Sequence, residues 1–328
     1  MAAMTIDLHA HPGRFFLDGL ADDDPAMALR ALGGPATDLA DLRPAGMTAV
    51  AVATISDLRA LRLDPAGGLV PGPPVGDDVA YADHLRQVAA ARAAVDAAGL
   101  RLLATGSDLD AAAAAGVPCA LLACEGADFV DTDLARLEAA FERGVRSVQL
   151  VHYAANRFGD VQTLPPTHAG LTEAGADVIR EMNRLGMLVD LAHATFETTC
   201  DAVRVSTAPI MVSHTHLRGT GHDHPRMIGV EHAHVVADAN GVIGVWPSGF
   251  SSRSLDDFVR EIDRLADVVG PDHVGIGTDM DANYRPVMTS YRQFAVLRDA
   301  LGARGYSSAE VDVMLGGNAA RLIRTVCR

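Results

Sequence analysis

The chain has 328 residues and a mass of 34.3 kDa, enough for one large or two ordinary domains. Its residues are 49% hydrophobic, which excludes a disordered chain, and its net charge of −15 argues against nucleic-acid or anionic-membrane partners, because both need a basic surface. All 27 basic residues are arginine, so a P-loop lysine, a Schiff base and a carboxylated-lysine metal bridge are excluded.

Cysteine usage and the lengths of apolar runs bear on where the protein resides. The four cysteines include no Cys-x-x-Cys pair, in contrast to a secreted disulfide framework. Cys119 and Cys124 flank an apolar run and are expected to be buried thiols. A strand-like pattern already begins at Thr5, which leaves no room for a signal peptide, and no apolar run approaches 18 residues. We therefore expect a soluble, cytoplasmic protein.

Short β-rich runs alternate with longer amphipathic or alanine-rich stretches along the chain. The expected strands are Thr5–His11, Met47–Ile55, Leu100–Thr105, Pro118–Cys124, Ser147–His152, Leu188–His193, Pro209–His214, Gly241–Trp246 and His273–Thr278. Helical patterns lie between them, and examples are Val79–Ala98, Asp131–Arg143, Thr172–Leu185, Leu255–Val269 and Tyr291–Arg304. Strand–helix alternation at this spacing is typical of βαβ units and a parallel sheet.

The number of strands and the chain length together favour one fold class. Nine candidate strands in a chain longer than about 250 residues predict an α/β fold, a (β/α)8 TIM-type barrel with one extra strand and C-terminal helices. We assign Leu100–Thr105 as the extra strand, because it is short and is followed closely by another. The segment Leu63–Asp78 is rich in proline and glycine, which predicts a loop after the second strand. With no internal repeat evident, residues 1–328 are expected to form a single barrel domain.

Polar residues recur where the predicted strands end. On the first strand His9 and His11 point to the same face, because side chains alternate along a strand. Glu125 follows a buried apolar strand. Apolar packing does not explain a carboxylate at that position. Further strand ends carry His152, His193, His214 and Asp279. In a barrel these strand ends meet at one rim, which is where active sites of this fold lie.

Imidazole and carboxylate groups converging in this number are typical of a site for zinc or a similar divalent ion, and they exceed what one ion requires. A second ion needs a bridging anion. Many barrel hydrolases place a carboxylated lysine there, which this lysine-free chain lacks. Glu125 is the acidic strand-end residue that we identify in the middle of the barrel, and it is our candidate bridge.

Most other histidines are expected to lie outside the site. His216 is an open case, because it lies two residues beyond His214. A polar loop and a helix start, where solvated or lid positions are expected, hold His222, His224, His232 and His234. His273 begins its strand and belongs at the opposite rim, whereas His84 and His168 are assigned to a helix and a loop.

The candidate site residues at the strand ends lie within longer segments that match a known family. The segments occur in the same order as in the family and extend through nearly the whole chain. The segments are Ile6–His11, Ala120–Gly126, Gln149–Asn156, Gly170–Gly175, Glu181–His193, Pro209–His214, Asp272–Asp281 and Gly316–Arg321. The blocks Glu181–His193 and Asp272–Asp281 are the specific ones. By these segments the chain resembles the membrane (renal) dipeptidase family of zinc metallopeptidases, whose fold is an amidohydrolase-type barrel.

The resemblance implies two divalent metal ions, expected to be Zn2+, and assigns their ligands. It makes His9 and His11 ligands of one ion, and His193 and His214 ligands of the other. Glu125 would bridge the two ions. The first strand departs from the family pattern, which has aspartate where this chain has His11, so the first site loses one negative charge.

The resemblance also implies the catalytic and substrate-binding residues. His152 would contact the substrate carbonyl, and Asp279 would be the catalytic carboxylate. Arg226 would hold the α-carboxylate of the substrate, and it enters through the resemblance alone.

The implied activity is hydrolysis of dipeptides, including those with a C-terminal D-residue, by a hydroxide that bridges the two metal ions. A small dipeptide is then the expected partner, with neither nucleic acid nor membrane, and a homodimer is the assembly we consider. Three alternatives stay open. They are a metal-dependent amidohydrolase for N-acyl amino acids or other carboxylate-bearing amides, a mononuclear deaminase-like barrel in which Glu125 carries protons, and a metal-binding homologue without turnover.

Overall fold

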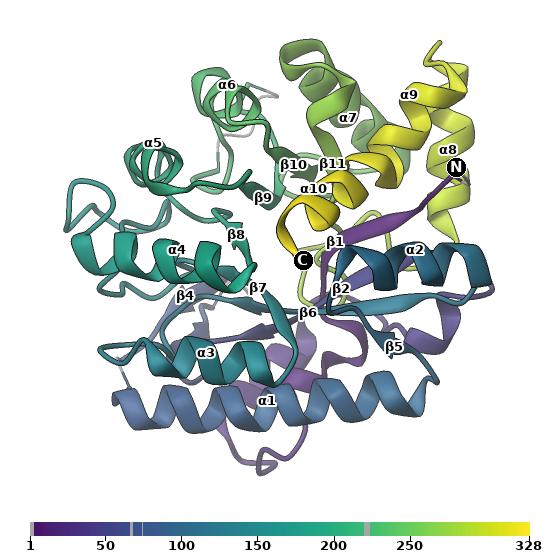
Figure 1. The fold of residues 1–328 in the computed structure, drawn as a ribbon. Coiled ribbons are helices and arrows are strands. Elements are labelled where there is room, and N and C mark those ends of the chain that lie inside the picture. The colour runs from purple at the N-terminus through teal and green to yellow at the C-terminus, as the bar shows by residue number, and fades with distance from the viewer. Residues whose placement is uncertain (1–2, 66–67, 74, 220–223) are drawn as a thin grey trace.

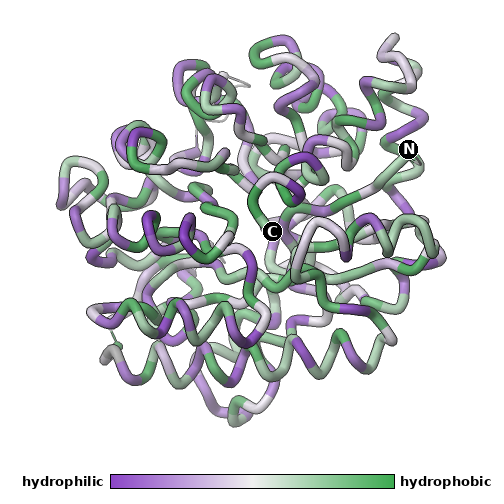
Figure 2. The backbone as a smooth tube through the Cα atoms, in the orientation of Figure 1, coloured by the Kyte–Doolittle hydropathy of each residue, from purple (hydrophilic) through white to green (hydrophobic). Residues whose placement is uncertain are grey.

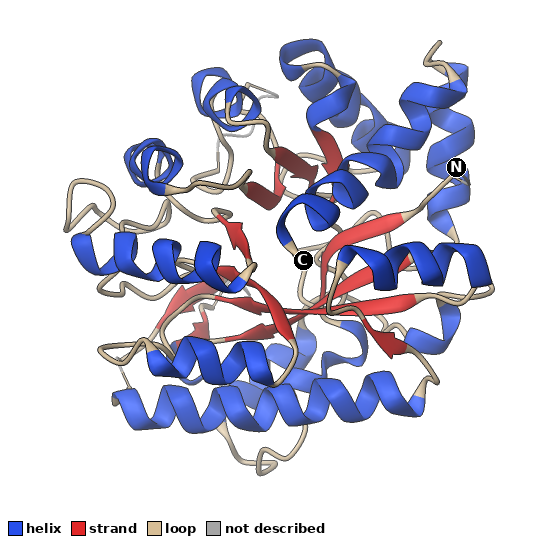
Figure 3. Ribbon diagram, viewed as in Figure 1, coloured by secondary structure: helices blue, strands red, loops and turns tan. Residues whose placement is uncertain are grey.

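The computed structural model describes residues 3–65, 68–73, 75–219 and 224–328. Parallel strands form a nearly closed barrel, in the order β1 (Ile6–Ala10), β2 (Ala49–Ile55), β6 (Cys119–Glu125), β7 (Val145–Gln149), β8 (Leu188–Asp190), β9 (Met211–Thr215), β10 (Val242–Val245) and β11 (Val274–Ile276). A further strand, β5 (Arg101–Leu102), pairs with β6 outside this path. Figure 3 shows the strands at the centre with helices around them. The predicted barrel with one extra strand is confirmed.

The barrel closes where the segment after β11 lies alongside β1. The backbone N–H of Asp279 donates to the carbonyl of His9 over 2.8 Å, and the N–H of His11 donates to the carbonyl of Met280 over 2.9 Å. Ala10 and Met280 form a parallel bridge between the same segments. Closure therefore brings residues from the two ends of the barrel path, His9, His11 and Asp279, next to one another.

Helices surround the strands (Figure 1). They are α1 (Asp77–Ala97), α2 (Gly106–Ala115), α3 (Ala135–Glu142), α4 (Glu173–Leu185), α5 (Phe196–Val205), α6 (Val230–Asp238), α7 (Leu255–Val269), α8 (Gln293–Ala303), α9 (Ser308–Asp312) and α10 (Asn318–Val326). Local signals explain their ends: the Thr172 side chain accepts a hydrogen bond from Gly175 at the start of α4, and Gly186 ends that helix at φ +76°. No helix among the described residues is both long and apolar enough to cross a bilayer.

Two segments differ from the predicted elements. The segment predicted as a loop after the second strand contains β4 (Leu69–Pro71), which forms an antiparallel hairpin with β3 (Leu61–Leu63). In addition, α2 separates β5 from β6, because a capping box of Thr105 and Asp108 starts a helix ahead of the alanine run. The proline and glycine residues of this segment predicted turns, and the strands between them are too short to give a recognisable strand pattern.

Apolar packing closes one end of the barrel and leaves the other end to polar groups. Figure 2 shows many hydrophobic residues in the central strands, whereas hydrophobic and hydrophilic residues alternate along the surrounding helices. At the amino ends of the strands, Ile6, Ala49 and Leu188 pack with Leu322 and Ile323 of α10 in one buried cluster. This packing explains why α10 lies across the strand starts in Figure 1. The carboxyl ends of the strands carry the buried polar residues.

Close strand contact near the rim requires glycine at two positions. A Cβ on Gly244 of β10 would lie 1.8 Å from the carbonyl oxygen of Ser213 in β9, and one on Gly277 would lie 1.9 Å from the same oxygen. An added methyl group could be accommodated only if the barrel strands moved apart, which would disrupt the hydrogen bonds between them. These two glycines thus fix the strand that carries His214.

We predict that Gly244→Ala destabilises the fold, because the new methyl group overlaps the Ser213 carbonyl. Overpacking of this kind costs on the order of 1–3 kcal/mol, measured as the free energy of unfolding in urea. Gly302→Ala, in the last turn of α8, is the matched control, since its added Cβ meets no atom within 4 Å. Equal stability of the two variants would contradict the close contact.

Candidate active site

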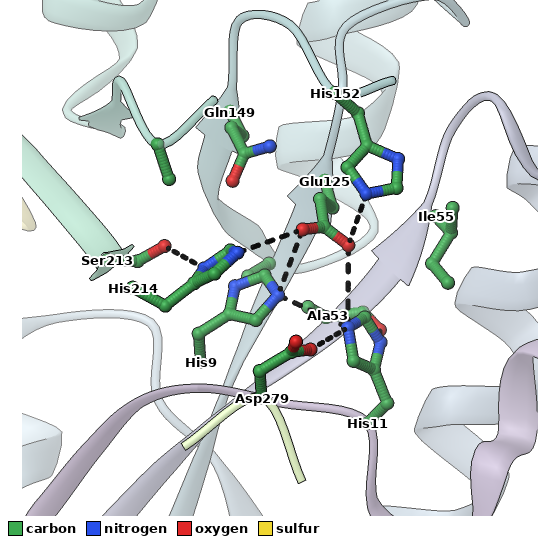
Figure 4. Close-up of polar contacts among 12 residues, drawn as sticks. His9, His11, Ala53, Ile55, Glu125, Gln149, His152, Ser213, His214 and Asp279 are labelled. Atoms are coloured by element: carbon green, nitrogen blue, oxygen red, sulfur yellow. Dashed lines mark hydrogen bonds and ion pairs between the residues drawn. The ribbon is translucent and has the colours of Figure 1, made fainter. Parts of the chain in front are cut away.

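Seven buried polar side chains meet at the carboxyl ends of the strands. Figure 4 labels these side chains except His193. The strand ends supply them as predicted: His9 and His11 from β1, Glu125 from β6, His152 after β7, His193 after β8, His214 from β9 and Asp279 after β11. They come from six different strands. The barrel thus converts residues scattered over 270 positions of the chain (from 9 to 279) into one cluster.

Glu125 lies at the centre of this cluster. Its Oε1 atom is 3.2 Å from Nε2 of His193, 3.4 Å from that of His214 and 3.5 Å from that of His9. Its Oε2 atom is 3.3 Å from Nε2 of His152 and 3.4 Å from that of His11. One carboxylate therefore contacts five imidazoles.

The ligand atoms form two groups that could each hold a metal ion and that share Glu125. One group is His9, His11 and Glu125, and the other is Glu125, His193 and His214. Within each group the two histidine Nε2 atoms are close, 3.2 Å apart in the first and 3.1 Å in the second. Nitrogen and carboxylate donors of this kind suit zinc or a related divalent ion. The geometry fits a site for two metal ions with a common carboxylate.

Hydrogen bonds at the second ring nitrogen orient two of these imidazoles. The Nδ1 atom of His11 is 2.8 Å from the carbonyl oxygen of Ala53, and Nδ1 of His214 is 3.0 Å from the hydroxyl of Ser213. A proton held on Nδ1 of His11 by that carbonyl leaves the Nε2 lone pair facing the cluster. His193 has no partner for Nδ1 among the described residues, and its backbone has φ +68°.

The two metal groups differ in their electrostatics. Burial by itself raises the pKa of Glu125, but the positive potential of His152 and His9 holds that pKa well below its usual range. Burial also holds the pKa values of His193 and His214 well below theirs, which favours the neutral imidazoles that a metal ion requires. Burial lowers the pKa of His11 too, but its contacts with Asp279 and Glu125 raise that pKa to about 10, so a metal ion in the first group would displace a proton from this imidazole.

Asp57 is a site residue that the sequence analysis missed. Its Oδ1 atom is 2.6 Å from Nδ1 of His152, and its Oδ2 atom accepts hydrogen bonds from the backbone N–H groups of Tyr153 and Ala154 at 3.1 and 2.8 Å. Burial lowers the pKa of His152, but the charges of Asp57 and Glu125 raise it above its usual value overall. Asp57 lies two residues beyond β2, so its place at the carboxyl end of a strand is the signal that could have identified it.

Asp279 lies next to His11 of the first metal group (Figure 4). Its Oδ1 atom is 3.3 Å from Nε2 of His11, and its Oδ2 atom accepts a hydrogen bond from the indole N–H of Trp246 at 3.2 Å. The residue has φ +52°, a conformation that non-glycine residues rarely adopt and that is found at functional sites. The carboxylate thereby faces the cluster from the side opposite Glu125.

Arg226 lies next to the site and is completely buried. It donates from Nη1 to the side-chain oxygen of Gln162 over 2.7 Å and from Nη2 to the carbonyl of His214 over 3.3 Å. Its guanidinium carbon is 5.5 Å from the ring centre of Trp246. The Nε–H has no acceptor among the described residues, and an unsatisfied buried donor is costly.

Two other carboxylates in the strands bind neighbouring strand segments, Asp7 near the start of β1 and Asp190 at the end of β8. Asp7 of β1 accepts hydrogen bonds from the N–H and the hydroxyl of Thr278, which follows β11. Asp190 of β8 accepts from the N–H groups of Ala192 and Ser213. Asp190 is therefore a second acidic strand end in the middle of the barrel, but its hydrogen bonds tie neighbouring strands together and leave Glu125 as the shared carboxylate.

The remaining histidines lie outside the two metal groups. The open case, His216, has Nδ1 2.9 Å from the hydroxyl of Ser251. His232 was expected to be exposed or in a lid, but it is buried in α6 with Nε2 2.9 Å from the hydroxyl of Thr199, because α6 packs on α5. His224 stacks on Phe250, and His234 is exposed. His222 lies outside the described residues.

A cavity opens above the cluster. Glu125, His152, His193, His214 and Asp279 are among the residues that line it. Arg226 is not among the lining residues.

Comparison with known proteins places this site in a family context. The family model described as "Membrane dipeptidase (Peptidase family M19)" matches residues 6–328. An uncharacterized dipeptidase of Schizosaccharomyces pombe is 35% identical over 58% of this chain, and the dipeptidase verJ of Clonostachys rogersoniana is 27% identical over 69% of it. These matches span 48% and 60% of the two relatives, so the chain covers less than two thirds of the length of each.

Solved structures show the same fold. The dipeptidase AC, a metallo peptidase, superposes with a TM-score of 0.83 at 22% identity and covers all of both chains. A metallo peptidase from Rhodobacter sphaeroides, liganded with a phosphinate mimic of the dipeptide L-Ala-D-Ala, gives a TM-score of 0.82 at 21% identity over 98% of this chain and 99% of its own. With a family match that runs through all eight strands of the barrel path and every residue of the cluster, the chain belongs to the membrane dipeptidase family, M19.

Proposed function

We propose that this chain is a metal-dependent dipeptidase that binds two metal ions, and that both ions are Zn2+. The observation that carries the proposal is the pair of His/His/Glu groups that share Glu125 at the mouth of the barrel. A mononuclear deaminase-like site would use only one such group. Family membership and the fold shared with the metallo peptidase that binds an L-Ala-D-Ala mimic support a dipeptide as the substrate.

The bound ions would polarise the carbonyl of the scissile bond and lower the pKa of water toward neutrality. The chain's own residues then bind and orient the substrate. Asp57 accepts a hydrogen bond from Nδ1–H of His152, and its charge favours the protonated imidazole, which carries a second proton on Nε2. That Nε2–H faces the cluster and is placed to donate a hydrogen bond to the carbonyl oxygen as negative charge develops there.

Proton transfer is assigned to Asp279. Its Oδ2 atom is held by Trp246 and its Oδ1 atom faces the cluster, so one oxygen is fixed while the other can accept a proton and pass it to the leaving amine. Arg226 is proposed to pair with the α-carboxylate of the substrate. Its unsatisfied Nε–H supports that role, and because Arg226 is buried, a small rearrangement of neighbouring side chains must accompany binding.

We further propose that residues 1–328 act as one barrel domain and that dipeptides with a C-terminal D-residue are accepted. The test of the function combines elemental analysis of the purified protein with a library of L,L- and L,D-dipeptides and N-acyl amino acids. We expect two metal ions per chain and hydrolysis of dipeptides. Hydrolysis of N-acyl amino acids alone would instead support the wider amidohydrolase function.

Glu125→Gln should remove metal binding, because a neutral amide is a weak ligand and the same oxygens serve both ions. The expected result is a fall from two metal ions per chain to one or none. The rate of dipeptide hydrolysis should fall with the metal content. Glu142→Gln, an exposed change at the end of α3, is the control and should keep both ions. Retention of two ions by Glu125→Gln would refute the shared carboxylate.

Asp279→Asn should keep both metal ions and reduce kcat by about 10²–10⁴-fold, the range typical of a lost acid–base group. The amide retains the hydrogen bond with Trp246, which preserves the local geometry. Steady-state kinetics on metal-saturated protein gives the comparison. Turnover at the wild-type level would eliminate Asp279 from proton transfer.

Asp57→Asn should lower kcat with little change in KM or metal content, because the amide keeps the shape but loses the charge that favours protonated His152. Loss of a residue that orients another typically costs about 10–100-fold. The exposed change Asp23→Asn is the control. If KM rises while kcat stays constant, Asp57 acts on substrate binding and not through His152.

A further inference from the structure

The cavity above the metal groups has two chemically different walls. One wall carries the carboxylates and imidazoles of the cluster. A second part of the lining, which we call the apolar wall, consists of Phe16, Leu29, Leu32, Ile55, Leu69 and Ala282. Among the described residues that line the cavity, Glu125 and Asp279 are the acidic ones and no arginine is present. The apolar wall therefore offers no partner for a charged side chain.

The segments that form the apolar wall pack together independently of the main barrel core. Phe16, Leu29 and Ile55 belong to one buried cluster, and Leu32 and Leu69 pack against it. The cluster joins the loop after β1, the end of β2 and the β3–β4 hairpin. A side chain that enters the cavity would extend this existing apolar cluster.

Polar contacts behind the wall hold its position. Arg14 donates to the carbonyl of Leu32 over 2.6 Å, and Gly33 donates to the carbonyl of Asn283 over 3.1 Å. Gly33 has φ +75°, and a Cβ there would lie 2.2 Å from the backbone of Asp281, so this close approach requires glycine. The wall is thus fixed before substrate arrives, which reduces the entropic cost of binding.

The position of the wall relative to Arg226 indicates which part of a dipeptide it meets. Ile55 pairs with Glu125 in the register of β2 and β6 and lies beside it, and the ring of Phe16 is 5.5 Å from that of His11. The guanidinium of Arg226 instead contacts His214 and Trp246, which are not part of the apolar wall. With the α-carboxylate on the Arg226 side, the side chain of the first residue points toward the apolar wall.

We propose that the apolar wall binds the side chain of the N-terminal residue and selects dipeptides in which that residue is large and apolar, such as leucine, methionine or phenylalanine. This inference rests on the proposed dipeptidase function. Each methylene group in such a pocket changes kcat/KM by about 10–200-fold. The side chains of the apolar wall offer no hydrogen-bond partner to a carboxylate or amide of the same shape.

Three dipeptides of matched shape, Leu-Gly, Asn-Gly and Asp-Gly, test the proposal on the metal-saturated wild-type protein. We expect kcat/KM for Leu-Gly to exceed that for Asn-Gly by at least about tenfold, and that for Asp-Gly by about a hundredfold. Equal values for the three, or a preference for Asp-Gly, would overturn the proposal.

Leu69→Asn and Leu32→Asn test the wall itself, because asparagine keeps the branched shape of leucine and both positions are only partly buried. The ratio of kcat/KM for Leu-Gly to that for Asn-Gly should fall about tenfold in each variant. Leu134→Asn, at the exposed start of α3, should leave the ratio unchanged. Unchanged ratios in both wall variants would contradict the assignment.

The same experiment separates this inference from the proposed function. Hydrolysis of dipeptides with no discrimination at the first residue overturns the apolar wall as a selective pocket and leaves the dipeptidase function standing. If protein with two metal ions per chain hydrolyses none of them, the proposed function fails. Calorimetric Kd values for Leu-Gly and Asp-Gly then decide the pocket: tighter binding of Leu-Gly supports it, and equal values overturn it.

Discussion

The contact of a single buried carboxylate with several imidazoles determines the rest of the site. A carboxylate removed from water is stable only when positive charge or strong hydrogen-bond donors surround it, and Glu125 has five histidine nitrogens within 3.5 Å. Metal ions on either side would satisfy the same need with greater strength. The barrel serves this arrangement, because β1, β6, β8 and β9 must end at one level for their side chains to meet.

Much of the fold and most of the cluster could be predicted from the sequence, because both depend on short-range patterns. Buried strands appear as apolar runs, and a polar residue at the end of such a run has no packing role, which singled out Glu125 and His214. The absence of lysine was equally informative, since it left a carboxylate as the candidate bridge. The β3–β4 hairpin could not be predicted, because its strands are three residues each and proline and glycine dominate the segment.

Contacts between distant segments account for the residues that the sequence did not reveal. Asp57 is one of many aspartates in the chain, and its role depends on His152, 95 positions away, reaching it across the barrel rim. The burial of Arg226 depends on Trp246 and Gln162, which come from other loops. His232 is buried because α6 packs on α5, a relation that the local sequence does not encode. Each of these required the three-dimensional arrangement.

The structure divides the work of the cavity between its two walls. The catalytic wall is built from strand ends, the most rigid part of a barrel, whereas the apolar wall is built from the loop after β1 and the β3–β4 hairpin. Substrate preference could therefore change through the loop and hairpin without disturbing the ligands. His11, which stands where the family pattern has aspartate, lies among the metal-binding residues. This difference bears on the affinity of the group formed by His9, His11 and Glu125 for its metal ion.

Anomalous X-ray diffraction from crystals of the metal-saturated protein, collected on both sides of the zinc absorption edge, tests the central claim most directly. The account predicts two anomalous peaks, one between His9 and His11 and one between His193 and His214, with each metal ion bound to a different oxygen of Glu125 or both to one. A single peak, or two peaks with Glu125 bound to neither, would contradict it.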